Sequence, residues 1–317
     1  MTTLGRGAVL VAAAGLFIAG CGGGEGDAGS GSAPASPDRP SVVVTTNILG
    51  DIVGEVAGGV ADVHVLMPAG ADPHSFGVSA ADAERMEDAD LIVANGLGLE
   101  EGVLNNVEAA ADVGVTVLEV APELDPLRYG DAAGASSGSF DPHIWTDPTR
   151  MIAAVDLIAE AIRPLPGVDP DVVDQAATDY AEELGEMDES MSERFEVIPP
   201  EDRRLVTNHH VFAYFAEHFD FEVIGAVLPS GTTLASPSAS DLEDLADVLR
   251  ETGVPAIFAD SSDPARLAEV LASEAGVDVE VVSLFTESLG PAGSGAETYL
   301  EMLDTNADLI VAALVEG

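Results

Sequence analysis

The chain contains no lysine, only one cysteine and few aromatic residues. Among its 317 residues, 57 are aspartate or glutamate and the 11 basic residues are all arginine, which gives a formal net charge of −46 at pH 7. This charge argues strongly against nucleic acid as a partner, because phosphates demand a basic face. It also attracts cations, although salt screens the attraction over about 8–10 Å. Solubility in a salty medium explains most of the charge, since a binding site needs few carboxylates.

The single cysteine excludes an internal disulfide and lies where a lipid anchor is expected. Residues 8–19 form an apolar run that is too short for a stable membrane-spanning helix. The run ends in Ile-Ala-Gly followed by Cys21, which resembles the bacterial lipobox; the alternative is an accidental cysteine after a cleaved signal. We predict a signal peptide at 1–20 and a flexible Gly/Ser/Pro tether at 21–40. The mature protein is then exported and held by lipid at the outer face of the cell membrane.

Nearly half of the chain is apolar, and short β-branched runs alternate with helical stretches from residue 41 onward. We predict four strands in the first half (42–46, 60–67, 89–95 and 115–120) and four in the second (205–208, 222–228, 256–260 and 277–284). This order predicts an α/β fold with two similar lobes, at 41–168 and 199–317, each a four-stranded parallel sheet flanked by helices.

One long helix, within 169–198, is predicted to join the two lobes as a rigid linker. Pro170 lies at its start, and Pro199 and Pro200 end it, which leaves about 27 residues and about 40 Å of helix. Its apolar residues recur at steps of three and four: Val173, Ala176, Tyr180, Leu184, Met187, Met191, Phe195 and Ile198. Because open parallel sheets bind ligands at the carboxyl ends of their strands, we expect the binding site in the crevice between the lobes.

Two further helix starts are marked by capping residues. Asp147 precedes Pro148, which is the pattern of an N-cap followed by proline at the first helical position. Ser240 and Glu243 have the spacing of a capping box.

Three of the six histidines lie just beyond predicted strands or before helices: His74, His143 and His209. The first two share the tripeptide Asp-Pro-His, in which proline limits the freedom lost when an imidazole engages a ligand. Asp72 and Asp141 then either orient the imidazole rings or cap turns. His209 and its neighbour His210 face opposite ways if strand geometry persists.

Neutral imidazoles drawn from both lobes predict a transition-metal site, because they are the commonest ligands for borderline metals such as Zn²⁺. A fourth ligand would complete a closed tetrahedron. Asp260 and Glu287, which follow the third and fourth strands of the second half, are both candidates, and spacing alone does not choose between them. His64 and His218 suit surface positions.

Seven segments together resemble the zinc- and manganese-binding solute-binding proteins of metal ABC importers (the ZnuA/TroA-like cluster A-I, solute-binding protein family 9). They cover nearly everything after residue 41, in order: Asp-Pro-His-Ser-Phe (72–76), Ala-Asp-Leu-Ile-Val-Ala-Asn-Gly-Leu-Gly-Leu-Glu (89–100), Asp-Pro-His-Ile-Trp-Thr-Asp-Pro (141–148), Thr-Asn-His-His-Val-Phe-Ala-Tyr-Phe-Ala (207–216), Ile-Phe-Ala-Asp (257–260), Phe-Thr-Glu-Ser-Leu (285–289) and Thr-Tyr-Leu-Glu-Met-Leu (298–303).

The resemblance implies a metal buried between the lobes, with His74, His143 and His209 as three ligands. The fourth family ligand, usually an aspartate, falls on Glu287, with Asp260 in reserve. Manganese-selective relatives commonly carry glutamate in place of His209, and three nitrogens with one oxygen suit Zn²⁺ better than Mn²⁺. Against zinc, residues 125–140 lack the histidine-rich loop of many zinc members. We therefore expect Zn²⁺, with Mn²⁺ as the alternative.

The resemblance also implies the partners, which are a membrane permease and its cytoplasmic ATPase. It further implies that the protein is a monomer without enzymatic activity. Two other functions remain open at this point. A three-histidine zinc site is able to hydrolyse a substrate if its fourth position is open, although no His-Glu-x-x-His helix is present. A surface adhesin is the other alternative, because exported lipoproteins can act in that way.

Overall fold

The computed structural model describes residues 39–130, 136–262, 265–276 and 279–315, all of which belong to one folded unit. The predicted signal peptide, Cys21 and nearly all of the tether lie outside the described residues. At the end of the tether, Pro40 is already buried, and its carbonyl accepts a hydrogen bond from the Asp62 amide at 2.8 Å. Among the described helices, none is both long and apolar enough to cross a membrane.

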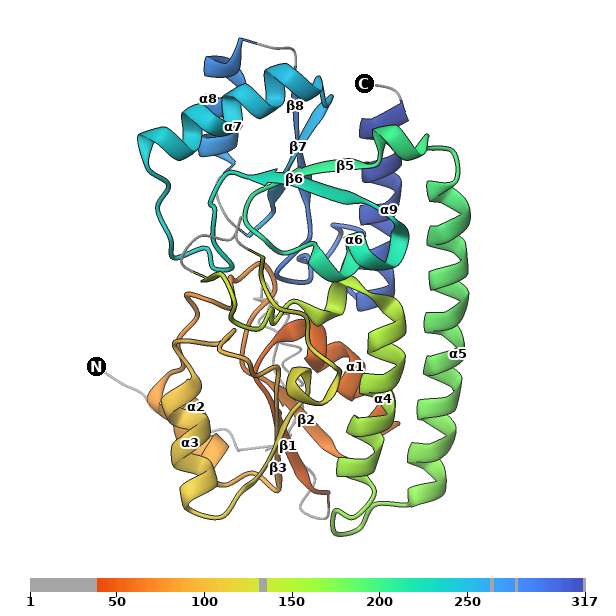
Figure 1. Cartoon of the computed structure of the whole chain (residues 1–317). Coiled ribbons are helices and arrows are strands. Elements are labelled where there is room, and N and C mark those ends of the chain that lie inside the picture. Colours follow the sequence, from red (N-terminus) through yellow and green to blue (C-terminus); the bar gives the residue numbers. More distant parts are fainter. Residues whose placement is uncertain (1–38, 131–135, 263–264, 277–278, 316–317) are drawn as a thin grey trace, which may run out of the picture. The chain divides into compact units, whose positions relative to one another are not determined.

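The first half of the chain forms a four-stranded parallel sheet in the order β2-β1-β3-β4; β1, β2 and β3 are labelled in Figure 1. Its elements are β1 (Ser41–Val44), α1 (Asn47–Ala57), β2 (Asp62–Val65), α2 (Ala80–Glu87), β3 (Leu91–Ala94), α3 (Leu104–Asp112) and β4 (Thr116–Glu119). Alternate residues of β1 face opposite layers, because side chains alternate along a strand. Val43 packs in the core beneath α2 and α3, whereas Val42 and Val44 belong to the core shared with α1 and α4 (Pro148–Ile162).

The second half repeats this arrangement, in the strand order β6-β5-β7-β8. Its elements are β5 (Arg204–Thr207), α6 (Ala213–Phe219), β6 (Glu222–Ala226), α7 (Ala239–Thr252), β7 (Ala256–Asp260), α8 (Arg266–Ala275), β8 (Glu280–Leu284) and α9 (Tyr299–Val315). Ile257 and Ala259 face the core beneath α7 and α8, while Phe258 faces the other layer. The predicted fold of two four-stranded parallel sheets flanked by helices is confirmed.

Of the two helix starts predicted from capping residues, one is confirmed and one is wrong. Asp147 caps α4, where its side chain accepts hydrogen bonds from the Thr149 and Arg150 amides and Pro148 is the first helical residue. The capping box of α7 is formed by Ser238 and Asp241, and not by Ser240 and Glu243. An aspartate at the third helical position completes the reciprocal hydrogen bonds as a glutamate does, so the helix begins two residues earlier than predicted.

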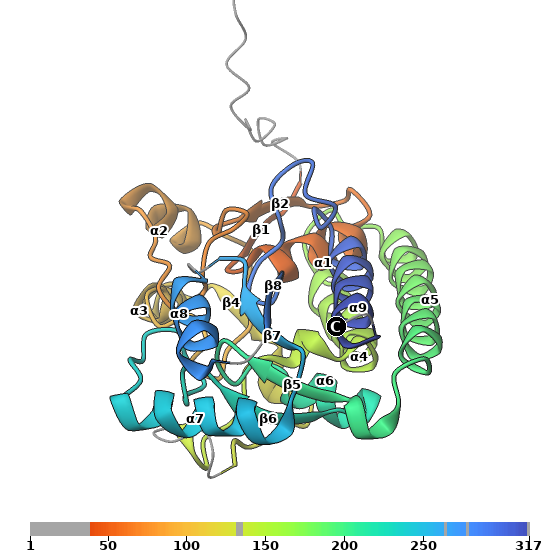
Figure 2. The same ribbon diagram turned by 90° about the horizontal axis from the view of Figure 1, so that it is seen from above.

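The long helix between the halves is α5 (Pro170–Phe195), a continuous run of 26 residues capped by Asp169. It lies along one side of both sheets, next to α4 and α9 (Figures 1 and 2). Most of the predicted stripe is buried, with Ala177 in place of Ala176 and with Met187 only partly covered. One hydrophobic core therefore includes residues of the first sheet, α5, α9 and the second sheet.

A partly buried carboxylate of α1 joins the two halves at the start of α9. Asp51 accepts a hydrogen bond from the Tyr299 amide at 2.8 Å, which satisfies one of the unpaired amides at a helix N-terminus. Burial raises the pKa of Asp51 to about 6, and the charges of Glu55 and Glu301 act in the same direction, while the hydrogen bond opposes them. The folded protein therefore holds this proton more tightly than the unfolded chain, in which an aspartate has a pKa near 3.9.

We predict that Asp51→Asn stabilises the protein at neutral pH. A raised pKa gives a stabilisation that is fully present below about pH 4 and is lost as the pH rises through about 6, and two pKa units correspond to about 3 kcal/mol. The variant should exceed the parent by about 2–3 kcal/mol at pH 7 and match it near pH 4 in urea unfolding. Glu108→Gln, which removes an exposed charge on α3, is the control. An unchanged pH profile in Asp51→Asn would contradict the prediction.

Candidate metal centre

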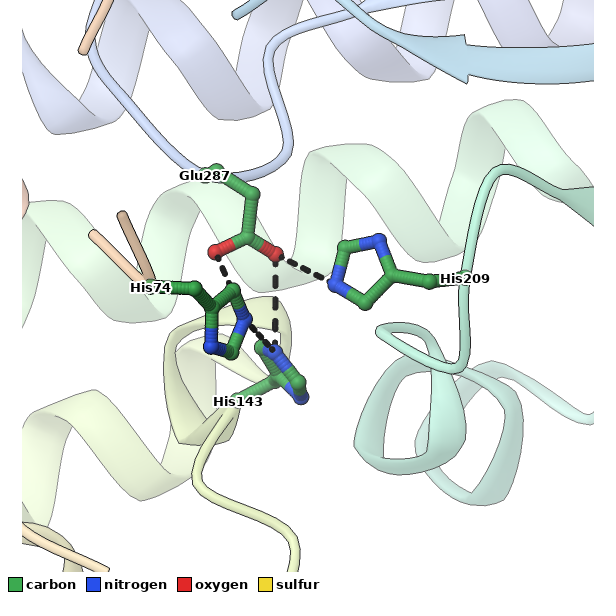
Figure 3. Close-up of side chains that lie close together, drawn as sticks. All are labelled: His74, His143, His209 and Glu287. Atoms are coloured by element: carbon green, nitrogen blue, oxygen red, sulfur yellow. Dashed lines mark hydrogen bonds and ion pairs between the residues drawn. The ribbon is translucent and has the colours of Figure 1, made fainter. Parts of the chain in front are cut away.

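Four side chains from four separate segments meet between the two sheets (Figure 3). His74 follows β2, His143 precedes a short 3₁₀ helix (Ile144–Thr146), His209 follows β5 and Glu287 follows β8. All four are buried, the most exposed of them at 2%. The carboxyl ends of parallel strands place these segments at the facing edges of the two sheets, as the sequence predicted.

The potential ligand atoms lie close enough together to surround a single ion. The Nε2 atoms of His74 and His143 are 3.3 Å apart, and His209 Nε2 is 3.0 Å from the nearer carboxylate oxygen of Glu287. The other two imidazoles lie 3.5 Å (His143) and 3.9 Å (His74) from Glu287 oxygens. Ligands bonded to tetrahedral zinc at about 2.0–2.1 Å are separated by about 3.3–3.4 Å, so the spacing fits one dication.

Burial controls the protonation of this group. Desolvation raises the pKa of Glu287 well above its usual range, and the charges of Asp260, Asp72 and Asp141 add to the effect. Desolvation and the neighbouring imidazoles lower the pKa values of His74 and His143. These two imidazoles are therefore neutral, which is the form that binds metals.

Apart from the three imidazoles, the Glu287 carboxylate has no polar partner among the residues that the structure describes. Neither of its oxygens makes a hydrogen bond there, and the nitrogens facing them belong to the three imidazoles. A buried carboxylate without donors or a counter-charge is costly. A cation between the four side chains would supply the missing charge, so the donor set fits a metal ion.

Asp141 both caps a turn and orients an imidazole, so both alternatives for this residue are correct. Its Oδ1 atom accepts a hydrogen bond from the His143 amide at 2.9 Å and lies 2.7 Å from Nδ1 of the same residue. The hydroxyl of Tyr129 is 3.0 Å from that Nδ1 atom. These contacts leave Nε2 of His143 directed toward Glu287. Burial raises the pKa of Asp141 to about 7, while the His143 amide and Tyr129 lower it.

Asp72 caps the corresponding turn without a hydrogen bond to the imidazole ring. Its Oδ1 atom accepts from the His74 amide at 2.9 Å. Its Oδ2 atom accepts from the hydroxyl of Thr233 at 2.7 Å, which ties the His74 turn to the second half of the chain. Of the two alternatives for Asp72, the structure therefore supports the turn cap.

Asp260, the reserve candidate for the fourth ligand, lies outside the group of four. It accepts hydrogen bonds from the Ser262 amide at 2.6 Å and from the hydroxyls of Ser262 and Thr286. Because Thr286 precedes Glu287, Asp260 supports the segment that carries the glutamate. Its own oxygens are engaged in these bonds.

The other histidines lie outside the site, as predicted. His210 is partly exposed, and its amide donates to the Ser230 carbonyl at 2.9 Å. His64 contacts Arg85 at 2.9 Å, and Nε2 of His218 lies 2.5 Å from Oδ1 of Asp188.

Several residues that contact the site or the turns beside it carry no signal of this role in the sequence. Tyr129 lies in a glycine- and serine-rich stretch with no recognisable spacing, so no local signal marks it. Glu100 is buried and accepts hydrogen bonds from the Thr45 hydroxyl at 2.6 Å and the Asn95 amide at 2.7 Å. In the sequence, Glu100 stands out only as the last residue of a segment that resembles the family. Leu97, with a φ of 56° between two glycines that also have positive φ, shows how tightly this turn is folded.

The structure has the architecture of a two-lobed binding protein. A long helix bridges its two parallel α/β lobes, and the lobes enclose a buried group of histidines and a carboxylate. The chain belongs to the ZnuA family, described as the zinc-uptake complex component A, periplasmic, whose model matches residues 42–313.

Individual relatives cover nearly the whole chain. The zinc-binding protein TroA of Treponema pallidum is 35% identical over 90% of this chain and 92% of its own length. The manganese-binding lipoprotein MntA of Halalkalibacterium halodurans is 29% identical over 94% of this chain and 95% of its own. Among solved structures, TroA superposes with a TM-score of 0.79 at 33% identity, covering 87% of this chain and 99% of TroA.

Proposed function

We propose that this protein is the metal-capturing component of an ABC importer, which binds a dication between its two lobes and delivers it to a membrane permease with a cytoplasmic ATPase. The observation that carries the proposal is the buried group of four donor residues drawn from both lobes. Membership of the ZnuA family supports the same function. The protein acts as a monomer by capture and release, without chemistry on the ion.

The proposed ligands are His74, His143, His209 and Glu287, and the proposed ion is Zn²⁺. Three imidazole nitrogens and one carboxylate oxygen suit tetrahedral zinc, whereas Mn²⁺ favours sites with more oxygens. The named relatives include both a zinc-binding and a manganese-binding protein, so Mn²⁺ is the second candidate. Asp141 orients His143, and Asp260 supports the segment of Glu287.

The burial of the site favours transport over hydrolysis. A hydrolytic zinc needs an open position for water or substrate. Here all four proposed ligands are at most 2% exposed, and four protein ligands complete a tetrahedron. An adhesin function has no observation in its favour among the described residues.

The proposed location is the outer face of the cell membrane, with a lipid at Cys21. The lipobox-like sequence before Cys21 supports the anchor, and relatives such as MntA are named lipoproteins. The stretch between Cys21 and Pro40 would act as the tether.

We expect His143→Ala to abolish tight zinc binding, with a loss of more than about 100-fold, since even residues that only orient ligands contribute about 10–100-fold. Competitive titration with Zn²⁺ and Mn²⁺, repeated with Glu287→Ala, measures both the affinity and the preference. His64→Ala, a histidine of β2 outside the site, should bind as the parent does. Tight zinc binding by His143→Ala would contradict the proposed site.

Zinc affinity should fall as the pH is lowered from about 7.5 to about 5, because protons compete with the metal for the ligands. The raised pKa of Glu287 makes this carboxylate hold a proton at a higher pH than usual, whereas the imidazoles with lowered pKa values are already neutral. Calorimetry in buffers of different ionisation enthalpy should detect proton release on zinc binding, and less of it in Glu287→Gln. A flat affinity over this range would argue against the assignment.

Replacement of the cysteine should release the protein from the membrane. In Cys21→Ala no acyl chain is attached, and the hydrophobic contribution of about 0.8 kcal/mol per buried methylene is lost. Cell fractionation should find the variant in the soluble extracytoplasmic fraction, with unchanged zinc affinity. His64→Ala should stay with the membrane. A membrane-bound Cys21→Ala protein would contradict the lipid anchor.

A further inference from the structure

The segment that carries Glu287 belongs to the second half by sequence but is bonded to the first half. We call residues 285–289, which follow β8, the Glu287 segment. It lies between the two sheets, and the carboxylate points from it toward the three imidazoles (Figure 3). The position of its backbone therefore decides where the carboxylate lies.

Asn47, at the start of α1, contacts the Glu287 segment with both ends of its side-chain amide. Its Nδ2 atom donates to Ser288 Oγ at 2.7 Å, and its Oδ1 atom accepts from the Leu289 amide at 3.0 Å. The second hydrogen of Nδ2 goes to the Pro68 carbonyl at 3.0 Å. Asn47 is 8% exposed, so these bonds form away from water, where an unmade bond is costly.

Two other residues of the first half add to this attachment. The Gly70 amide approaches Ser288 Oγ at 2.8 Å and the Leu289 carbonyl at 3.0 Å. The indole nitrogen of Trp145 donates to the Thr286 carbonyl at 2.7 Å. The residues on both sides of Glu287 are thus bonded to the half that also carries His74 and His143.

Among the described residues, the hydrogen bonds from other side chains of the second half to this segment go to residues before Glu287. Asn306 of α9 exchanges two hydrogen bonds with the Phe285 backbone, at 3.0 and 2.8 Å. Asp260 accepts from the Thr286 hydroxyl. Within the described part of the chain, the side-chain bonds that hold Ser288 and Leu289 from another element come from Asn47.

We propose that Asn47 is a positioning residue for the metal site, which fixes Glu287 against His74 and His143 by holding the next two residues of its segment. The inference rests on the proposed function. Glutamate has a longer side chain than aspartate and more rotamers to restrict. A fixed backbone on both sides of Glu287 reduces the volume that its carboxylate samples, so the ion meets a preorganised ligand.

The test is a double-mutant cycle on zinc affinity in the purified protein, with Asn47→Ala, Glu287→Ala and the double variant. Asn47→Ala alone should weaken zinc binding about 10–100-fold, as expected for a residue that orients a ligand. In the Glu287→Ala background the same substitution should change the affinity by less than about threefold, because no carboxylate is left to position. The visible spectrum of bound Co²⁺ should shift in Asn47→Ala toward that of Glu287→Ala.

Two further variants separate positioning from a general loss of stability. Val56→Ala removes a buried side chain from the same helix; it should lower the unfolding midpoint and leave zinc affinity unchanged. Ser288→Ala removes the hydroxyl that Asn47 contacts, and it takes the place of Asn47→Ala in the cycle if that variant does not fold.

Equal losses of affinity in both backgrounds, or parent-like affinity in both Asn47→Ala and Ser288→Ala, would overturn the positioning role. Failure of the proposed function looks different. In that case the parent protein does not bind zinc, or Glu287→Ala binds zinc as tightly as the parent does, and the inference falls with it.

Discussion

A carboxylate buried among three imidazoles is the constraint on which the rest of the site depends. Glu287 is 1% exposed and faces His74, His143 and His209 without a hydrogen-bond donor in the described part of the chain. Such a carboxylate stays in one position only if its surroundings hold it there or a cation neutralises its charge. Asp141 contacts the ring of His143, and Asn47 holds the residues that follow Glu287, so both act on proposed ligands from outside the group of four.

The two-lobed architecture makes such a site possible. Each sheet places the carboxyl ends of its strands toward the other, and α5 runs along both (Figure 1). The apolar core passes without a break from the first sheet through α5 and α9 to the second. A site assembled from both lobes binds its ion most strongly when the lobes are together, because the donors then reach it at the same time.

The acidic exterior and the interior of the site have separate roles. The net charge of −46 raises the concentration of all cations near the surface. It does not distinguish one dication from another, because screened charge acts at a distance without regard to ligand type. The proposed selectivity comes from the three nitrogens and one oxygen of the buried group, whose softness and number suit a borderline metal.

The sequence by itself determined the features that depend on local pattern. Runs of β-branched residues mark the eight strands, and proline positions mark the helix that begins at Pro170. The three histidines stand out by residue type and by their place beside strands and helices. The capping box of α7 shows the limit of such patterns, because Ser238 and Ser240 are both plausible caps and the backbone uses the first.

Only the tertiary structure places Glu287, and not Asp260, beside the three histidines, and only it brings Asn47 and Tyr129 into contact with residues of this group or its segments. The Asn47 amide meets Ser288 across 241 residues of sequence, and Tyr129 reaches His143 from a loop without periodicity. The physical reason is that a hydrogen bond between distant segments leaves no spacing in the chain. It exists only after strand order and helix packing have brought the two segments together.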